Sequence, residues 1–270
     1  MRKFKTSLCL LTLFLTACRT PSGHEDLSSI RGDGQDRDIC DAYAKQSASP
    51  TGNTIAALIK SMRSRDCADL LQKIGNVTSL SLVSQGLSDL TILALALNLE
   101  SLDVSDNSLT TLAPLAKLTK LQYLGASQNK LKSIPANSDW SSIQRLDLSS
   151  NGLEGLDGIG RLSKLEVLNI SSNKIVDLTA TSNNEHLEIL EANNNLIVNI
   201  APLSLLTRLE QLYVANNQIR DLRPVVSLVN LRYVKYFDVS GNPIDKHGCP
   251  IIGDSDAVTK TCQNKFVDRN

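Results

Sequence analysis

A strict 22-residue period governs most of this 270-residue chain and constrains its fold more than any other feature. Successive copies of the pattern Leu-x-x-Leu-x-Leu-x-x-Asn-x-Leu follow one another at this step. They start at Val77, Leu99, Leu121, Ile143, Leu165, Leu187 and Leu209. An eighth copy starts at Val234, after an insertion of three residues. Such a period is typical of a solenoid, in which each coil buries its apolar face against its neighbours.

Leucine supplies the repeated core of these coils. The chain contains 44 Leu, whereas aromatic residues make up only 4% of it. The Leu-x-Leu segment of each copy predicts a short strand, and strands of successive coils should pair in parallel. The turns between strands are too short for full helices, so 3₁₀ segments are expected on the opposite side. Lys+Arg and Asp+Glu are both 28, which argues against nucleic acid as the main partner.

An asparagine recurs at the ninth position of the coils, where each strand must turn. The first coil has Gln85 there instead, a departure typical of a terminal repeat. Backbone groups in a turn lose their strand partners, and a buried amide side chain can satisfy them. The sequence therefore predicts a structural asparagine ladder, formed by Asn107, Asn129, Asn151, Asn173, Asn195, Asn217 and Asn242.

The repeat resembles the leucine-rich repeats, over residues 77–244. Tails such as Ile200-Ala-Pro202-Leu203 resemble the 22-residue class found in bacterial internalins. The resemblance implies an α/β solenoid, a right-handed superhelix with short parallel strands on a concave face and 3₁₀ or irregular segments on the convex side. Asn137 and Thr181 interrupt the apolar positions of that convex side, and the lone Trp140 is predicted to fill the gap there.

Residues 1–17 are predicted to be a secretory signal peptide, with a basic start and an apolar stretch over residues 8–15. The end of this segment, Leu15-Thr16-Ala17-Cys18, resembles the lipobox of bacterial lipoproteins. The resemblance implies cleavage before Cys18 and acylation of that residue. The alternative is an ordinary signal peptide whose cleavage region contains a cysteine. The residue after Cys18 is not Asp, which favours the outer membrane in the best-known sorting rule for such lipoproteins.

The segments around the repeats have distinct predicted roles. Residues 18–39 are polar and are expected to form a flexible tether. Residues 40–76 contain two short apolar-faced segments that predict a small helical N-terminal cap, and residues 245–270 should cap the other end. With Cys9 in the signal peptide and Cys18 acylated, four cysteines remain for disulfides in the exported chain. Four cysteines allow three pairings. The simplest staples each cap locally, Cys40 with Cys67 and Cys249 with Cys262.

The outward positions three and five of each 22-residue coil are the candidate binding surface. They combine aromatic, aliphatic and acidic residues, which is typical of a protein-binding patch. The predicted partner-binding residues are Asp103, Tyr123, Arg145, Asp147, Val167, Asn169, Ile189, Glu191, Tyr213, Tyr236 and Asp238. The alternative interpretation is a merely solvated face. Clustering of acids here favours a partner with a basic surface.

The predicted function is protein recognition by a lipid-anchored module of the cell envelope. The alternative is a structural scaffold or spacer subunit of an envelope assembly. Catalysis is not expected, because His24, His186 and His247 lie far apart in the sequence and no triad, metal cluster or phosphate loop accompanies them. No cofactor, metal or nucleic-acid partner is expected either. Fold alone does not name the partner.

Overall fold

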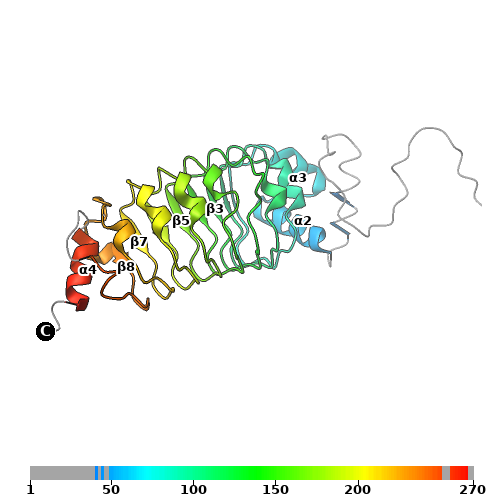
Figure 1. Ribbon diagram of the computed structural model, residues 1–270. Coiled ribbons are helices and arrows are strands. Elements are labelled where there is room, and N and C mark those ends of the chain that lie inside the picture. Colours follow the sequence, from blue (N-terminus) through cyan, green and yellow to red (C-terminus); the bar gives the residue numbers. More distant parts are fainter. Residues whose placement is uncertain (1–39, 42–43, 46–48, 251–255, 267–270) are drawn as a thin grey trace, which may run out of the picture.

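The computed structural model describes residues 40–41, 44–45, 49–250 and 256–266. The predicted signal peptide, Cys18 and the tether lie outside these residues. The described part is a solenoid, in which coils stack along one axis between helices α2 and α3 at one end and α4 at the other (Figure 1).

Eight short parallel strands form a single sheet in chain order. Neighbouring strands pair at a 22-residue offset, as in Leu80 with Leu102, until the last pair, Leu212 with Phe237. The central residue of each three-residue strand is buried, because it points into the solenoid core. The strands are β1 (Ser79–Ser81), β2 (Ser101–Asp103), β3 (Tyr123–Gly125), β4 (Arg145–Asp147), β5 (Val167–Asn169), β6 (Ile189–Glu191), β7 (Gln211–Tyr213) and β8 (Phe237–Asp238).

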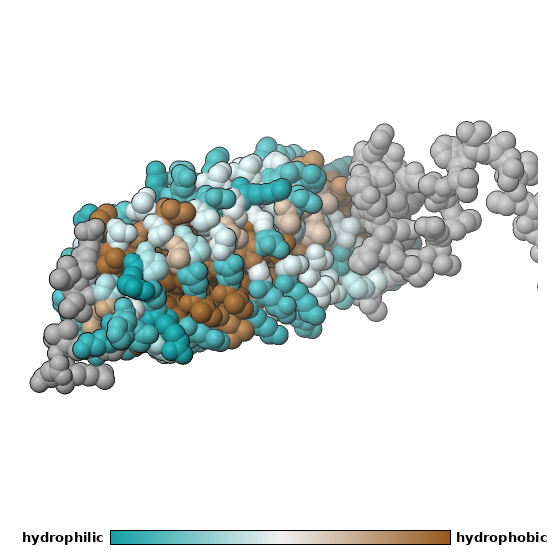
Figure 2. Space-filling view, in the orientation of Figure 1, coloured by the Kyte–Doolittle hydropathy of each residue, from teal (hydrophilic) through white to brown (hydrophobic). Residues whose placement is uncertain are grey.

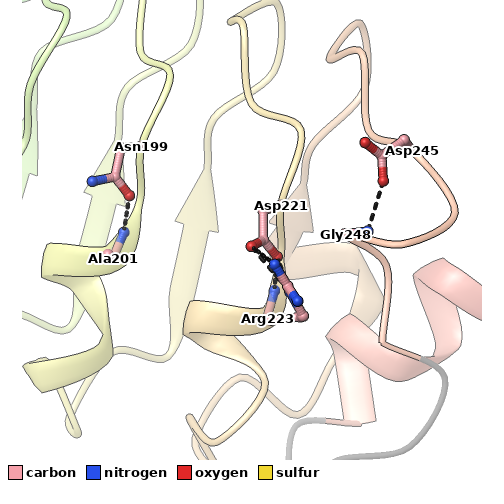
Figure 3. A network of polar contacts seen from close by, with 6 residues as sticks. All are labelled: Asn199, Ala201, Asp221, Arg223, Asp245 and Gly248. Carbon is pink, nitrogen blue, oxygen red and sulfur yellow. Dashed lines mark hydrogen bonds and ion pairs between the residues drawn. The ribbon is translucent and has the colours of Figure 1, made fainter.

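Short 3₁₀ helices form the side opposite the sheet. They are η2 (Thr91–Leu95), η3 (Ala113–Leu115), η4 (Ile159–Arg161), η5 (Thr179–Asn183), η6 (Ala201–Leu205), η7 (Arg223–Val225) and η8 (Val234–Tyr236). Side-chain oxygens before five of these helices accept backbone N–H groups, which a short helix cannot satisfy internally. Figure 3 shows two such bonds in successive coils, from Ala201 to Asn199 and from Arg223 to Asp221, and the bond from Gly248 to Asp245 in a turn of the last coil.

The asparagine ladder joins each coil to the one before it. In the fifth coil, Asn173 Nδ2 donates to the Leu148 carbonyl of the preceding coil at 3.0 Å, and Asn173 Oδ1 accepts from Leu153 N–H of that coil at 3.0 Å. The same bond to the preceding coil recurs for all seven asparagines. Gln85 has no preceding coil and donates instead to Val83 of its own coil.

The third and fifth coils each lack an apolar residue at one convex position, and each fills the core there in a different way. Trp140 is 1% exposed, fills the core of the third coil and donates from Nε1 to the Leu115 carbonyl at 2.8 Å. No 3₁₀ helix forms in this coil, and Asn137 lies exposed. In the fifth coil Thr181 is instead fully buried, and its hydroxyl donates to the Leu178 carbonyl at 2.8 Å. A buried hydroxyl is tolerated there because it has a partner.

Helices cap both ends of the stack. At the start lie α2 (Pro50–Ser61), whose first turn is capped by the side chain of Ser49, and α3 (Cys67–Ile74). At the end lies α4 (Asp256–Phe266), a helix that the sequence patterns did not predict. Disulfides join Cys40 to Cys67 and Cys249 to Cys262, the two local pairings. In the described part of the chain no helix is long and apolar enough to span a membrane.

Candidate protein-binding surface

The outward side chains of the sheet form two parallel rows, which we call the strand face: positions three and five of the coils, from β2 to β8. Strand pairing sets the order within each row, so that Val167 lies beside Ile189, and Asn169 beside Glu191. Both aliphatic side chains are half-buried and form an apolar centre, with the exposed Arg145 on the neighbouring strand. The fold therefore brings the predicted residues of β2 to β7 together on one face.

Most carboxylates of the strand face also have a local structural role that the sequence patterns did not reveal. Asp103 Oδ1 accepts from the Ser105 backbone N–H at 3.0 Å, just beyond its strand. The equivalent bond is made by Asp147, Asn169 and Asp238. Each side chain thereby caps the backbone where the strand ends, a known use of Asp and Asn. Because Asn169 makes the same bond without a charge, the negative charge is not what the cap requires.

Gly125 interrupts the fifth-position row, and Tyr123 extends over the gap. A methyl group at Gly125 would lie 2.7 Å from Tyr123 Oη and 2.9 Å from Asp103 Oδ1, so both side chains reach across this position. Burial raises the pKa of the Tyr123 phenol above its ordinary value, and the carboxylates of Asp103 and Asp147 raise it further. The phenol is thus held neutral between two carboxylates, with its hydroxyl available as a hydrogen-bond donor.

Glu191 is the acid of this surface for which no local cap bond is found. Burial raises the pKa of its carboxyl above the ordinary value, and the Asp147 carboxylate raises it further. The adjacent Tyr213 donates its hydroxyl to Gln211 Oε1 at 3.1 Å. Burial also raises the pKa of the Tyr213 phenol, with Glu191 the next contributor. The ionised form of Glu191 is therefore disfavoured in the free protein, and a cation placed beside it would favour that form.

The last coil departs from the predicted strand. Tyr236 was expected at position three of β8, but it lies in η8, and only Phe237 and Asp238 pair with β7. Tyr236 packs edge-to-face against Tyr233 with 6.1 Å between ring centroids, and Lys235 Nζ lies 4.4 Å from the Tyr236 centroid. The coil keeps the predicted register, with Leu212 beside Phe237, and only Tyr236 leaves the strand. The three-residue insertion was the only sequence signal for Tyr233 and Lys235.

The other predicted residues lie away from the strand face. The asparagine ladder lies in the turns, and the cysteine pairs lie at the two ends of the stack. Cys18 is outside the described residues. Within the described ranges, no group of three or more His, Cys, Asp or Glu is placed to hold a metal ion.

The fold and this surface define a leucine-rich-repeat solenoid with an open strand face. A family model described as Leucine Rich repeats (2 copies) matches residues 97–139, 141–184 and 185–227. It indicates no enzyme family. No curated protein matches the chain.

Solved structures of bacterial leucine-rich-repeat proteins are similar to this chain. A leucine-rich-repeat protein of Leptospira interrogans is 22% identical over 64% of this chain and 51% of its own, with a TM-score of 0.58. The functional domain of InlJ from Listeria monocytogenes is 22% identical over 64% of this chain and 42% of its own, with a TM-score of 0.51. Internalin C2 from Listeria monocytogenes is 25% identical over 70% and 89%, with a TM-score of 0.49. The chain thus spans about half of the first two, and these likenesses concern the fold.

Proposed function

We propose that this chain is a lipid-anchored protein of the bacterial cell envelope that binds a protein partner through the strand face. One observation carries the proposal: the half-buried pair Val167 and Ile189 lies on an open sheet between polar neighbours. Arg145 and Gln211 flank the pair in its own row, and the other row holds Asp147, Asn169, Glu191 and Tyr213. Apolar centres with polar borders and tyrosines are enriched where proteins bind one another. The internalin-like class of the repeat and acylation at Cys18 are supported by the sequence patterns.

The chemistry of the strand face favours a partner that offers Lys or Arg. Asp103 and Asp147 each use one oxygen for a cap bond, which leaves the other oxygen for a ligand. A cation placed beside Glu191 would favour its ionised form, which burial disfavours in the free protein. Complementary charges at such a surface increase the rate and specificity of association.

Site-specific cross-linking in cells tests partner binding. A photo-reactive amino acid replaces Ile189 on the strand face or, as a matched control, exposed Arg161 on the opposite side. We expect a discrete cross-linked protein from position 189 and none from position 161. Equal cross-linking from both positions, or none from position 189, would show that the strand face is not the binding surface.

Neutralising the acids tests the charge preference without removing the caps. Asp103→Asn and Asp147→Asn preserve the acceptor for the backbone N–H, as Asn169 shows, and Glu191→Gln is nearly isosteric. The triple variant should fold like the parent and give a weaker cross-link from position 189, with less dependence on salt. An unchanged yield at low and high salt would refute the basic-partner part of the proposal.

Acylation is tested separately at Cys18. Cys18→Ser should abolish incorporation of labelled fatty acid and leave the protein soluble after cell breakage, because a chain without acyl groups has no stable anchor. Retention of the label, or of membrane attachment in the variant, would show that another residue or segment holds the protein at the membrane.

A further inference from the structure

The free edge of strand β1 is a second candidate binding site. As the first strand of the sheet, β1 pairs with β2 on one edge and, among the described residues, with no strand on the other. It lies beside α2 and α3 at one end of the stack, whereas in the view of Figure 2 hydrophobic residues gather over the middle coils. An uncovered strand edge presents backbone N–H and C=O groups that can pair with another chain.

The backbone groups of Ser79 and Ser81 point to this free edge. The Thr78 carbonyl and the Leu82 N–H both bond to β2, at 3.0 Å and 2.7 Å. Successive residues of a strand direct their backbone groups to opposite edges, so Ser79 and Ser81 direct theirs away from β2. No partner for the Ser79 carbonyl or the Ser81 N–H is found among the described residues. One acceptor and one donor are therefore available side by side.

A cavity of about 480 Å³ opens beside these groups, within the usual size range of ligand pockets. It is lined by β1 and by the ends of α2 and α3, and its apolar lining is Met62, Val77 and Leu80. Ser61 Oγ, at the end of α2, lies 3.4 Å from the Ser81 carbonyl. Because the cap helices come this close to the strand edge, there is room for a single extended segment and not for the sheet of a second copy.

We propose that the free edge of β1 binds an extended peptide segment of a partner protein, which pairs with β1 as one more strand. In the parallel arrangement of this sheet, one residue of the segment donates its N–H to the Ser79 carbonyl and accepts from the Ser81 N–H. That residue is the pairing partner of Leu80, so its side chain turns inwards with Leu80, towards Met62 and Val77. The site therefore selects an apolar residue there, and the residues on either side of it face outwards.

The edge site continues the rows of the strand face. Ser79 lies beside Ser101, and Ser81 beside Asp103. Ser79 and Ser81 are exposed, whereas Ser101 and Asp103, which have a strand on both sides, are half-buried. A segment bound at β1 lies next to the strand face, but its binding does not depend on the proposed function of that face.

Selection of peptides from a phage-displayed library of random heptapeptides tests the proposal. The target is the purified mature chain, with Cys18→Ser in place of acylation. Ser81→Pro removes the N–H at the free edge and no bond to β2, a change that edge strands tolerate. Ser81→Ala is the matched control, because it alters the same side chain and keeps the N–H. Urea denaturation checks that both variants fold.

We expect selected heptapeptides that carry an apolar residue near the middle and bind the parent and Ser81→Ala alike. Their affinity for Ser81→Pro should be at least about tenfold lower, and Asp in place of the apolar residue should weaken binding to the parent as much. Hydrogen exchange of the Ser81 amide in the parent should slow when such a peptide binds, because the N–H then has a partner.

Three results would overturn the proposal: a library that yields no peptide sensitive to Ser81→Pro, peptides that bind all three proteins equally, or a Ser81 amide whose exchange does not respond to the peptide. Slow exchange without peptide would also overturn it. If that protection is lost on deletion of residues 19–38, the chain's own upstream segment covers the edge. If it grows with protein concentration, a second copy does. The cross-link from position 189 reports on the strand face separately, so the proposed function can stand when this inference fails.

Discussion

Asn173 shows why one side chain recurs at the ninth position of every coil but the first. Its amide makes four hydrogen bonds, to Leu148, Ile170 and Ser171 as donor and to Leu153 as acceptor. Asn173→Ala would leave the buried Leu153 N–H without a partner, at about 1–3 kcal/mol for an unsatisfied group. It would also take one of two donors from the carbonyls of Leu148, Ile170 and Ser171, which keep their bonds from Asn151, Asn195 and Ser150 N–H. We expect a loss of about 2–4 kcal/mol in the free energy of unfolding, measured by urea denaturation.

Exposed Asn183, for whose side chain no hydrogen bond is found, supplies the control for that measurement. Asn183→Ala should change the free energy of unfolding by less than about 0.5 kcal/mol, as is usual for surface sites. Equal effects at positions 173 and 183 would contradict the structural role of the ladder.

The raised pKa of the Glu191 carboxyl predicts that its effect on stability depends on pH. The pKa of the Glu191 carboxyl is raised in the folded protein, so the carboxyl ionises more easily in the unfolded chain. The stability that Glu191 contributes at low pH is therefore lost as pH rises through the folded-state pKa. Glu191→Gln removes this dependence. The variant should gain in stability relative to the parent between acid and neutral pH, and match it most closely below the pKa of the unfolded chain. A stability difference between variant and parent that does not change with pH would contradict the raised pKa.

Among the coils, the third shows how one aromatic residue replaces a 3₁₀ helix. Trp140 fills the core and donates to the Leu115 carbonyl, which also accepts from Leu118 N–H. Trp140→Phe keeps an aromatic ring but removes the donor and part of the volume. We expect a loss of about 2–3 kcal/mol in the free energy of unfolding. A loss below about 0.5 kcal/mol would mean that this coil repacks without the tryptophan.

Elements that recur with the 22-residue period could be predicted from the sequence, and elements that occur once could not. The eight strands and the asparagine ladder follow from side chains that recur at fixed positions. Helix α4 and the turn η8 occur once, outside the period, and no repeated signal marks them. The rows of the strand face were predictable, because alternation alone turns their residues outward. The cap bonds of Asp103 and its equivalents were not, since Asp at a solvated position and Asp at a strand end look alike in sequence.

At the scale of the whole molecule, the constant step makes each coil a removable unit. Deleting residues 187–208 would place Leu209 where Leu187 was and join the fifth coil to the seventh in register. Because a solenoid is held together by neighbouring coils alone, this deletion should leave a folded chain with the same type of circular dichroism spectrum and a lower urea midpoint.

Deleting residues 187–206 instead leaves two extra residues in the fifth coil and is the comparison. The seventh coil already holds three extra residues while β8 pairs in register, so this variant should also fold. Its urea midpoint should lie below that of the 22-residue deletion, because the extra residues lengthen a turn. Equal midpoints for the two deletions would show that the exact 22-residue step does not stabilise the stack.

The cap bonds at the ends of the strands have a consequence for how such a surface evolves. Asp and Asn make the same bond to the backbone, as Asp147 and Asn169 do on neighbouring strands. A single base change in a codon interconverts the two residues. Selection can therefore alter the charge of the surface one step at a time while the scaffold beneath it stays constant. A lineage of such proteins could drift from acidic to neutral recognition without passing through an unstable intermediate.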